Sequence, residues 1–193
     1  MTVGALLALA ASALAADAKA DMVASQKAMN AQTNYRYTVT MTNPGKKVDK
    51  VEFEHIRPDR FHEKAARVEL TIIGAKAWQR LTGGAWQISR VNAAAITAGM
   101  QGPFTKDLMD KVTLSVVGGD TLNGQAMTVY RELYEVAGIK SDSKIWVGVK
   151  DHLAYQSRGT TDTSALKGPG SGISQFDVTY EYNVPGLSIE APM

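Results

Sequence analysis

Apolar and polar residues alternate with a period of two through much of this 193-residue chain. Every second side chain is apolar in residues 35–41, and the same holds for residues 175–182. Such alternation is typical of a strand with one face on a core and the other in water. We therefore expect the chain to fold around an antiparallel sheet with one apolar face.

The alternation recurs in several further segments, separated by turn residues. They are residues 50–54, a short strand that begins at Phe61, residues 68–72, 78–81, 86–88, 114–116, 127–129, 145–149 and 153–157, and a closing segment at 187–189. Residues 140–143 are interpreted as a polar turn, and residues 159–174, rich in Gly, Ser, Thr and Pro, as a long mobile loop. About ten strands with hairpin-length connections predict a single antiparallel meander.

Two segments break this period and indicate helices. Residues 16–33 contain neither Gly nor Pro and place Met22 and Met29 seven residues apart, which favours an amphipathic helix. Residues 92–100 are small and apolar, Gly102-Pro103 interrupts them, and residues 104–111 can form another short helix. We expect this helical insertion to lie in mid-sheet.

The predicted sheet has a larger apolar face than one helix of about 18 residues can cover. It must therefore curl on itself, pair with a second sheet, or leave a groove. An acyl chain that enters such a groove gains about 0.8 kcal/mol per buried methylene, so capture requires no polar motif. Small and Met residues of the helical insertion can form a movable lid over it.

Composition and the first residues indicate an exported protein. Residues 1–15 carry no charge and end in Ala13-Leu14-Ala15, which is typical of a signal peptide cleaved after Ala15, although a basic residue near the recorded start is missing. The chain has no cysteine, and its 21 basic against 19 acidic residues give no footprint for nucleic acid. We expect residues 16–193 to form one domain that is free in solution after export.

The sequence contains no convincing catalytic or metal-binding motif. Two Ser-x-x-Lys matches, at Ser141 and Ser164, are interpreted as chance matches in loops. His55 and His62 lack the spacing of a helical zinc site and are interpreted as surface strand histidines. We expect no metal and no cofactor, and an enzyme with His55 or His62 in its site is the third of three functional hypotheses.

The segment around Arg57-Pro58 lies between two alternating runs. Pro58 cannot donate to a strand ladder and pushes Arg57 toward an extended conformation, so a strand must turn or end there. A guanidinium at the rim of a sheet can bind a partner group. The alternative is an ordinary arginine at a strand end.

The order of several short motifs resembles the LolA-like family of periplasmic outer-membrane lipoprotein carriers. They are the leading helix, the Arg-Pro element after Phe53, Gly-Ala-Lys-Ala-Trp at 74–78, Trp86-Gln87 before the insertion, Leu122-Asn123-Gly124, and Lys144-Ile145-Trp146-Val147. The resemblance covers most of the chain after the signal peptide.

The resemblance implies an α+β, mainly antiparallel fold: an open curved half-barrel covered by the N-terminal helix and a helical lid. By position, Arg57 would be a latch that reaches the lid and holds the empty cavity shut. The apolar side chains expected to bind the ligand are Val39, Met41, Phe53, Phe61, Leu70, Ile72, Trp78, Trp86, Met100, Phe104, Leu108, Leu114, Val116, Met127, Val129, Ile145 and Val147.

The first hypothesis is therefore a soluble periplasmic carrier or binding protein for a lipid or a lipoprotein acyl chain, which exchanges it with an envelope membrane protein. The chain has only 4 Phe, and its insertion is rich in alanine. A lipid or a sterol-like molecule is therefore as consistent with the sequence as a lipoprotein acyl chain is. The alternative is a protein-protein interaction or sensing module of the envelope that uses the same half-barrel.

Overall fold

The computed structural model describes residues 18–43, 48–101, 110–166 and 171–192. The predicted signal peptide lies outside the described residues, as do Phe104 and Leu108 of the predicted lid. The side chain of Met100 is also outside them.

Eleven strands form one antiparallel sheet. The strands are β1 (Asn34–Thr42), β2 (Asp49–Ile56), β3 (Arg60–Lys64), β4 (Val68–Ile73), β5 (Lys76–Leu81), β6 (Gln87–Ile88), β7 (Val112–Leu122), β8 (Gln125–Val136), β9 (Ile139–Gly148), β10 (Ala154–Asp162) and β11 (Ile173–Tyr182). Their order is β6-β5-β4-β3-β2-β1-β11-β10-β9-β8-β7, so the sheet is open, with β6 and β7 at its two ends. Residues 18–30 are helical, and α2 (Ala93–Gln101) lies between β6 and β7 in the chain. The predicted fold class, an open and mainly antiparallel sheet with an N-terminal helix and a helical insertion, is confirmed.

The strand order corrects the prediction of one continuous meander. β1 to β6 and β7 to β11 each follow chain order, but β1 lies beside β11. Tyrosine rings of these two strands meet, since Tyr37 and Tyr180 have centroids 5.6 Å apart. The helical insertion follows β6 and precedes β7, so it interrupts the succession of strands as predicted, and these are the two terminal strands of the order.

Contacts divide the chain into two compact units. Unit 1 comprises Met1–Met29 and Pro103–Gln175, and unit 2 comprises Asn30–Gly102 and Phe176–Met193. The single domain at 16–193 stays a prediction.

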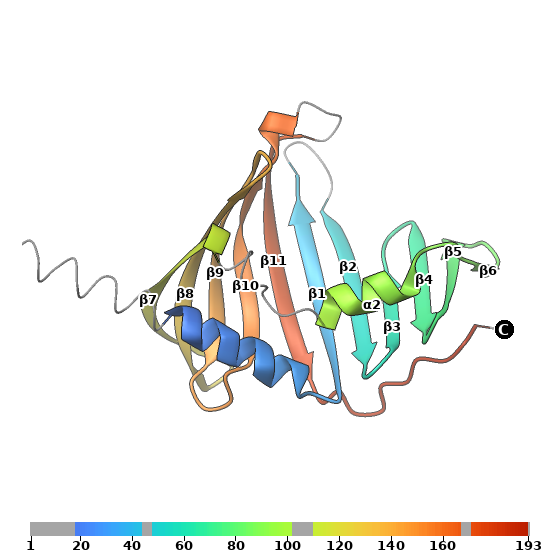
Figure 1. The fold of residues 1–193 in the computed structure, drawn as a ribbon, viewed down its shortest axis with the longest axis horizontal. Coiled ribbons are helices and arrows are strands. Elements are labelled where there is room, and N and C mark those ends of the chain that lie inside the picture. The colour runs from blue at the N-terminus through green and yellow to red at the C-terminus, as the bar shows by residue number, and fades with distance from the viewer. Residues whose placement is uncertain (1–17, 44–47, 102–109, 167–170, 193) are drawn as a thin grey trace, which may run out of the picture. The chain divides into compact units, whose positions relative to one another are not determined.

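Unit 1 has its core between the N-terminal helix and β7 to β10. Figure 1 shows this helix, in blue, across these strands. Ala18 and Met22 of the helix pack with Leu114 and Tyr130 of the sheet, and Met29 lies against the same cluster. The hydroxyl of Tyr130 also donates to the Asp21 carboxylate at 2.7 Å. The core forms because the strands turn every second side chain toward the helix, and the helix places buried residues at 18, 22 and 25 on one side.

Two tight turns set the registers of β7, β8 and β9. Asn123-Gly124 and Ala137-Gly138 all have positive φ, the conformation of two-residue hairpin turns that match the strand twist. Since the chain turns at Ala137-Gly138, the predicted turn at 140–143 is wrong, and these residues lie within β9. Asp142 there forms an ion pair with Arg131 of β8.

The predicted loop at 159–174 is shorter than expected. β10 continues to Asp162, a 3-10 helix η1 follows at Ser164–Leu166, and β11 begins at Ile173. Gly159 permits the extension, because a Cβ there would stand 2.3 Å from the backbone oxygen of Asp142 on β9. The closing segment at 187–189 is not a strand, although Ile189 is buried.

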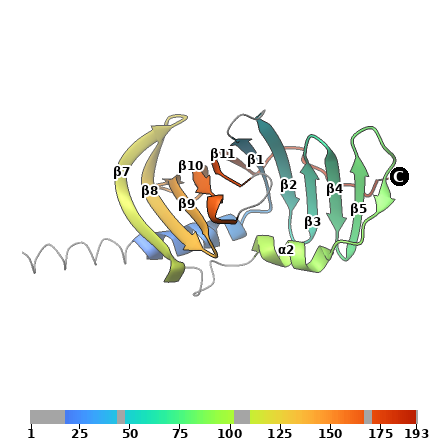
Figure 2. The same cartoon turned by 90° about the horizontal axis from the view of Figure 1, so that it is seen from above.

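Unit 2 has a second core beneath α2. Ala93 and Ile96 pack on Phe61, Ile72 and their neighbours, and Figure 2 shows α2 beside β2, β3 and β4. Asn92 caps the helix, because its side-chain oxygen accepts from the amide of Ala95 at 3.0 Å.

Candidate functional site

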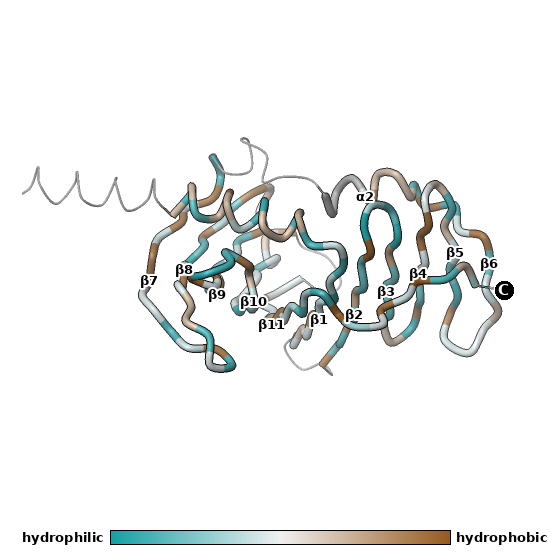
Figure 3. Tube along the Cα trace, turned by 90° about the horizontal axis from the view of Figure 1, so that it is seen from below, coloured by the Kyte–Doolittle hydropathy of each residue, from teal (hydrophilic) through white to brown (hydrophobic). Residues whose placement is uncertain are grey.

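Unit 2 carries two rows of side chains that cross β1 to β4 on one face. Residues directly opposite each other in a ladder share a face. The first row joins Tyr37, Phe53, Glu63 and Leu70, and the second joins Tyr35, His55, Phe61 and Ile72. Figure 3 shows hydrophobic and hydrophilic residues alternating along β2 to β4.

Aromatic rings dominate these rows and extend onto β11. Tyr37 stacks on Phe53 with centroids 4.5 Å apart, and Tyr180 lies 5.6 Å from Tyr37. Tyr35 and Tyr182 form the corresponding contact at 6.2 Å. We call this surface the aromatic face. It consists of Tyr35, Tyr37, Val39, Met41, Val51, Phe53, His55, Phe61, Glu63, Leu70, Ile72, Tyr180 and Tyr182.

The aromatic face is only partly used by the core of unit 2. Phe61 and Ile72 are fully buried near α2, whereas Tyr37, Phe53 and Leu70 are half-buried. Burial raises the pKa of the Tyr37 phenol, so the hydroxyl stays neutral. The face therefore offers apolar rings with neutral hydrogen-bonding groups at their tips.

His55 lies in the second row and is 1% exposed, so its interpretation as a surface histidine is wrong. Among the described residues, neither ring nitrogen has a hydrogen-bond partner. Burial and the nearby Arg57 guanidinium lower the pKa of His55 to about 4. The imidazole is therefore neutral at physiological pH, and its ring meets Tyr35 edge-on at 5.0 Å.

Arg57 lies at the rim of this face, beyond the end of β2. Its Nη2 atom donates to Oδ1 of Asn30 at 2.8 Å, and its backbone amide donates to Thr33 at 2.9 Å. The Nε atom is buried and has no partner among the described residues. Asn30 is the last helical residue of the segment 18–30, so the guanidinium binds a helix end. The latch role of Arg57 stays a prediction.

The opposite face of β1 to β5 is polar. Arg36 pairs with Glu54, His62 lies between Glu54 and Glu69 at 3.3 and 3.7 Å, and Arg80 pairs with Glu69. A pocket of about 300 Å³ lies here; its lining is Glu54, His62, Glu69, Thr71, Arg80, Trp86, Ser188, Ile189, Glu190 and Pro192. The opposed carboxylates and guanidinium groups largely satisfy one another.

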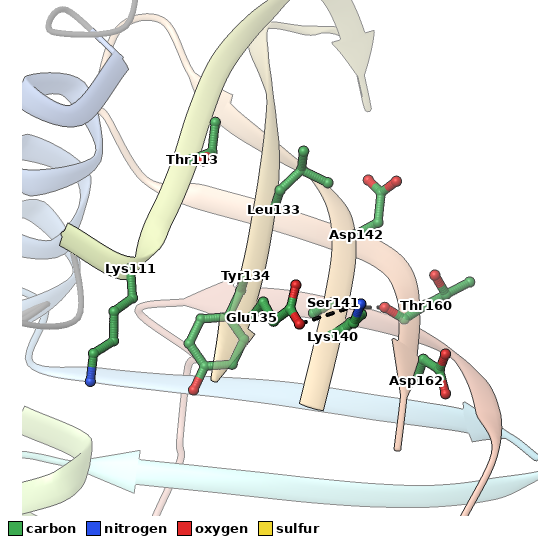
Figure 4. A pocket seen from close by; sticks show the side chains of 10 residues that line it. All are labelled: Lys111, Thr113, Leu133, Tyr134, Glu135, Lys140, Ser141, Asp142, Thr160 and Asp162. Carbon is green, nitrogen blue, oxygen red and sulfur yellow. Dashed lines mark hydrogen bonds and ion pairs between the residues drawn. The ribbon is translucent and has the colours of Figure 1, made fainter. Parts of the chain in front are cut away.

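A second polar pocket, of about 390 Å³, belongs to unit 1. Figure 4 shows its lining residues, with Lys140 pointing toward Glu135 at 3.3 Å. Leu133 and Tyr134 are its apolar members, and charged groups of both signs make up much of the rest. Neither pocket has the lining expected for a lipid chain.

Six of the residues expected to bind a ligand lie together in unit 2. Val39, Met41, Phe53, Phe61, Leu70 and Ile72 all belong to the aromatic face. Leu114, Ile145 and Val147 are buried in the core of unit 1, and Val116 is 41% exposed.

Four further candidates point away from these surfaces: two lie opposite the aromatic face of unit 2, and two lie opposite the core of unit 1. Trp78 pairs with Thr71 in the same row as His62, and the Trp86 ring packs under the Arg80 guanidinium at 4.7 Å on the polar face. Met127 and Val129 alternate with Tyr130, which faces the unit 1 core. We therefore leave these four out of the candidate site.

The tyrosines of the candidate site are absent from the residues that the sequence predicted to bind a ligand. Tyr35, Tyr37, Tyr180 and Tyr182 were recognised as strand residues but were not assigned to a ligand. The period-two alternation at 175–182 contained the signal. The pairing of β1 with β11, which brings the two pairs together, is a long-range contact.

The described residues give no sign of a metal centre or of a membrane-crossing helix. No three His, Asp or Glu side chains in them are grouped as metal ligands. No helix in the described part of the chain combines the length and apolar character needed to span a bilayer. His55 and His62 lie on opposite faces of the sheet, since His55 pairs with Phe61 and His62 with Glu54. They therefore cannot act together in one catalytic site.

This open antiparallel sheet with its N-terminal helix and insertion has a LolA-like fold, as the sequence resemblance predicted. The chain is similar to the lipoprotein LppX of Mycobacterium tuberculosis, with a TM-score of 0.62 and 14% identity over 90% of this chain and 98% of LppX. It is similar to LprF of Mycobacterium bovis, with a TM-score of 0.60 and 12% identity over 91% of this chain and 97% of LprF. No protein-family model matches the sequence, and no curated protein matches it. At these identities, the likeness establishes the fold.

Proposed function

We propose that the protein is a periplasmic carrier or binding protein for a lipid or a lipoprotein acyl chain, and that the aromatic face of unit 2 holds this ligand. The observation that carries the proposal is the first cross-strand row, in which Tyr37, Phe53 and Leu70 stay half-buried. Binding would remove their apolar surface from water at about 25 cal/mol per Å².

The neighbouring helix supports reversible binding. α2 has no acidic or basic residue, and its described side chains Ala93 and Ile96 pack with the apolar residues of this face. These apolar contacts would separate for a chain to enter beside Phe53. Burying an acyl chain of about ten methylenes would gain on the order of 8 kcal/mol before ordering costs, which would oppose their loss.

The fold supports an envelope role. LppX, with which the chain shares its fold, is a lipoprotein. After export, it would act as a free monomer that exchanges ligand with a membrane protein of the envelope and performs no covalent chemistry.

Binding of the neutral fluorescent probe N-phenyl-1-naphthylamine tests the site. We expect the probe to bind the wild-type protein, and Phe53→Ala to weaken binding about tenfold through loss of apolar contact. Trp78→Ala is the matched control, because it removes an aromatic ring from the opposite face of the same sheet, and it should leave binding unchanged. Equal loss in both variants would contradict the assignment of the aromatic face.

Mass spectrometry of organic extracts tests the natural ligand. Protein purified from the periplasm should release a lipid, and Phe53→Ala protein should release less of it. An empty wild-type protein that also fails to bind added lipid would overturn the carrier function.

A further inference from the structure

Glu63 places a carboxyl group in the middle of the aromatic face. Its direct neighbours across the ladders are Phe53 on β2 and Leu70 on β4. The side chain is half-buried, and among the described residues its carboxylate makes no hydrogen bond or ion pair. An unpaired carboxylate in such a place costs stability that an apolar residue would not cost. The face therefore contains a charge that its own fold does not use.

The groups around Glu63 favour a positive charge. The Glu63 carboxylate is close enough to Tyr37 to contribute to the raised pKa of that phenol. Tyr37 and Phe53 present stacked rings beside it, and ring faces attract cations. A carboxylate with aromatic rings is a combination suited to an ammonium group.

The other charged groups near Glu63 form no ion pair with it. His62 precedes it on β3 and partly opposes the rise that burial causes in the pKa of Glu63, but its side chain lies on the opposite face, beside Glu54 and Glu69. α2 contributes no charged residue, and His55 in the neighbouring row is neutral at physiological pH. Arg57 donates to Asn30 at the rim.

We propose that Glu63 determines ligand specificity and that the aromatic face selects an amphiphile with a cationic amine. The apolar part of the ligand lies along Tyr37 and Phe53, and its ammonium group donates to the Glu63 carboxylate. The same charge repels free fatty acids. This inference rests on the proposed function, because it assigns a ligand class to the same surface.

Displacement of N-phenyl-1-naphthylamine by dodecylamine, dodecanol and dodecanoate tests the inference, because the three compounds share one alkyl chain and differ in head-group charge. At neutral pH and low ionic strength, we expect wild-type protein to bind the amine at least about tenfold more tightly than the alcohol. Dodecanoate should bind most weakly. In Glu63→Gln the preference for the amine should disappear, and dodecanoate should bind more tightly than it does to the wild type.

Glu52→Gln is the control, because it removes the same charge from the polar side of β2, where Glu52 pairs with Lys50. It should keep the wild-type order of the three compounds. Equal binding of amine and alcohol by the wild type would overturn the role of Glu63 while leaving the proposed function intact, as would a preference that survives in Glu63→Gln. If neither the probe nor any of the three compounds binds, the proposed function fails as well.

Discussion

Tyr37 and Phe53 are direct cross-strand partners on β1 and β2, and their rings stack at 4.5 Å with planes 13° apart. Aromatic pairs in this arrangement add about 0.5 to 1.5 kcal/mol beyond the area they bury. A double-mutant cycle with Tyr37→Ala and Phe53→Ala, measured by urea unfolding, should give a coupling energy in this range. Tyr37→Ala and Trp78→Ala change opposite faces, so their effects should add. Equal coupling in both cycles would show that the stack is not specific.

Replacing Arg57 by Leu tests the predicted latch. The variant loses the 2.8 Å hydrogen bond to Asn30, which should lower the free energy of unfolding by about 1 to 3 kcal/mol. If Arg57 also restrains ligand entry, stopped-flow mixing with the fluorescent probe should show faster uptake and release. Asn30→Ala should change the same rates, and the two substitutions should not add. Unchanged rates would leave Arg57 with a purely structural role.

Protonation of His55 should destabilise the protein in acid. Its folded pKa of about 4 lies below the ordinary value of 6.5, so the unfolded chain takes up a proton first as the pH falls. The stabilisation is fully present above pH 6.5 and is lost between that value and about pH 4, for a total of roughly 2 to 4 kcal/mol. Urea unfolding across this window should show the loss in wild type and in His62→Gln, and a smaller loss in His55→Phe. An equal slope in His55→Phe would contradict this account.

Glu63 should destabilise the protein when it is ionised. Burial raises its pKa, so ionisation is less favourable in the folded state than in the unfolded chain, and the destabilisation grows as the pH rises through the titration. Glu63→Gln should therefore unfold at a higher urea concentration than wild type at neutral pH, with the difference shrinking in acid. Glu52→Gln should not gain stability, because the nearby Lys50 lowers the pKa of Glu52. If Glu63→Gln were less stable than wild type at neutral pH, the Glu63 carboxylate would be making a stabilising interaction in the folded protein, which would contradict this prediction.

Met22 should anchor the N-terminal helix to the strands of unit 1. It is 3% exposed and packs with Leu114 and Tyr130, whereas the adjacent Val23 is 39% exposed. Met22→Ala should lower the free energy of unfolding by about 2 to 5 kcal/mol, and Val23→Ala by at most about 0.5 kcal/mol. Thermal or urea unfolding measures both. Similar losses would indicate that the helix does not dock through this side.

Sequence patterns predicted where the strands lie in the chain better than they predicted which strands pair. Tyr35 to Met41 and Phe176 to Tyr182 were assigned correctly because a half-buried strand must alternate. Residues 140–143 of β9 were assigned to a polar turn, yet Lys140 and Asp142 lie on the strand and pair with Glu135 and Arg131. Local composition cannot distinguish an exposed turn from an ion-paired strand face.

The face of the sheet on which a side chain lies could be assigned only from the strand registers. Trp78 and Leu70 were both expected to contact the ligand, but the β4–β5 register pairs Trp78 with Thr71, and a shift of one residue would have reversed this. Aromatic character alone therefore did not place Trp78 or Trp86. Glu63 could not be assigned to this face from the sequence for the same reason, since only pairing with Phe53 and Leu70 shows that it shares their face.

The sequence by itself determined an antiparallel sheet, an N-terminal helix and a helical insertion, because these depend on periodicities within short segments. Only the tertiary structure decided that β1 lies beside β11, that four tyrosines meet on the aromatic face, and that Glu63 and His55 lie among them. Those relationships depend on pairing between strands far apart in the chain. Many alternative pairings satisfy the same local pattern, and the observed one unites the aromatic rings of β1, β2 and β11.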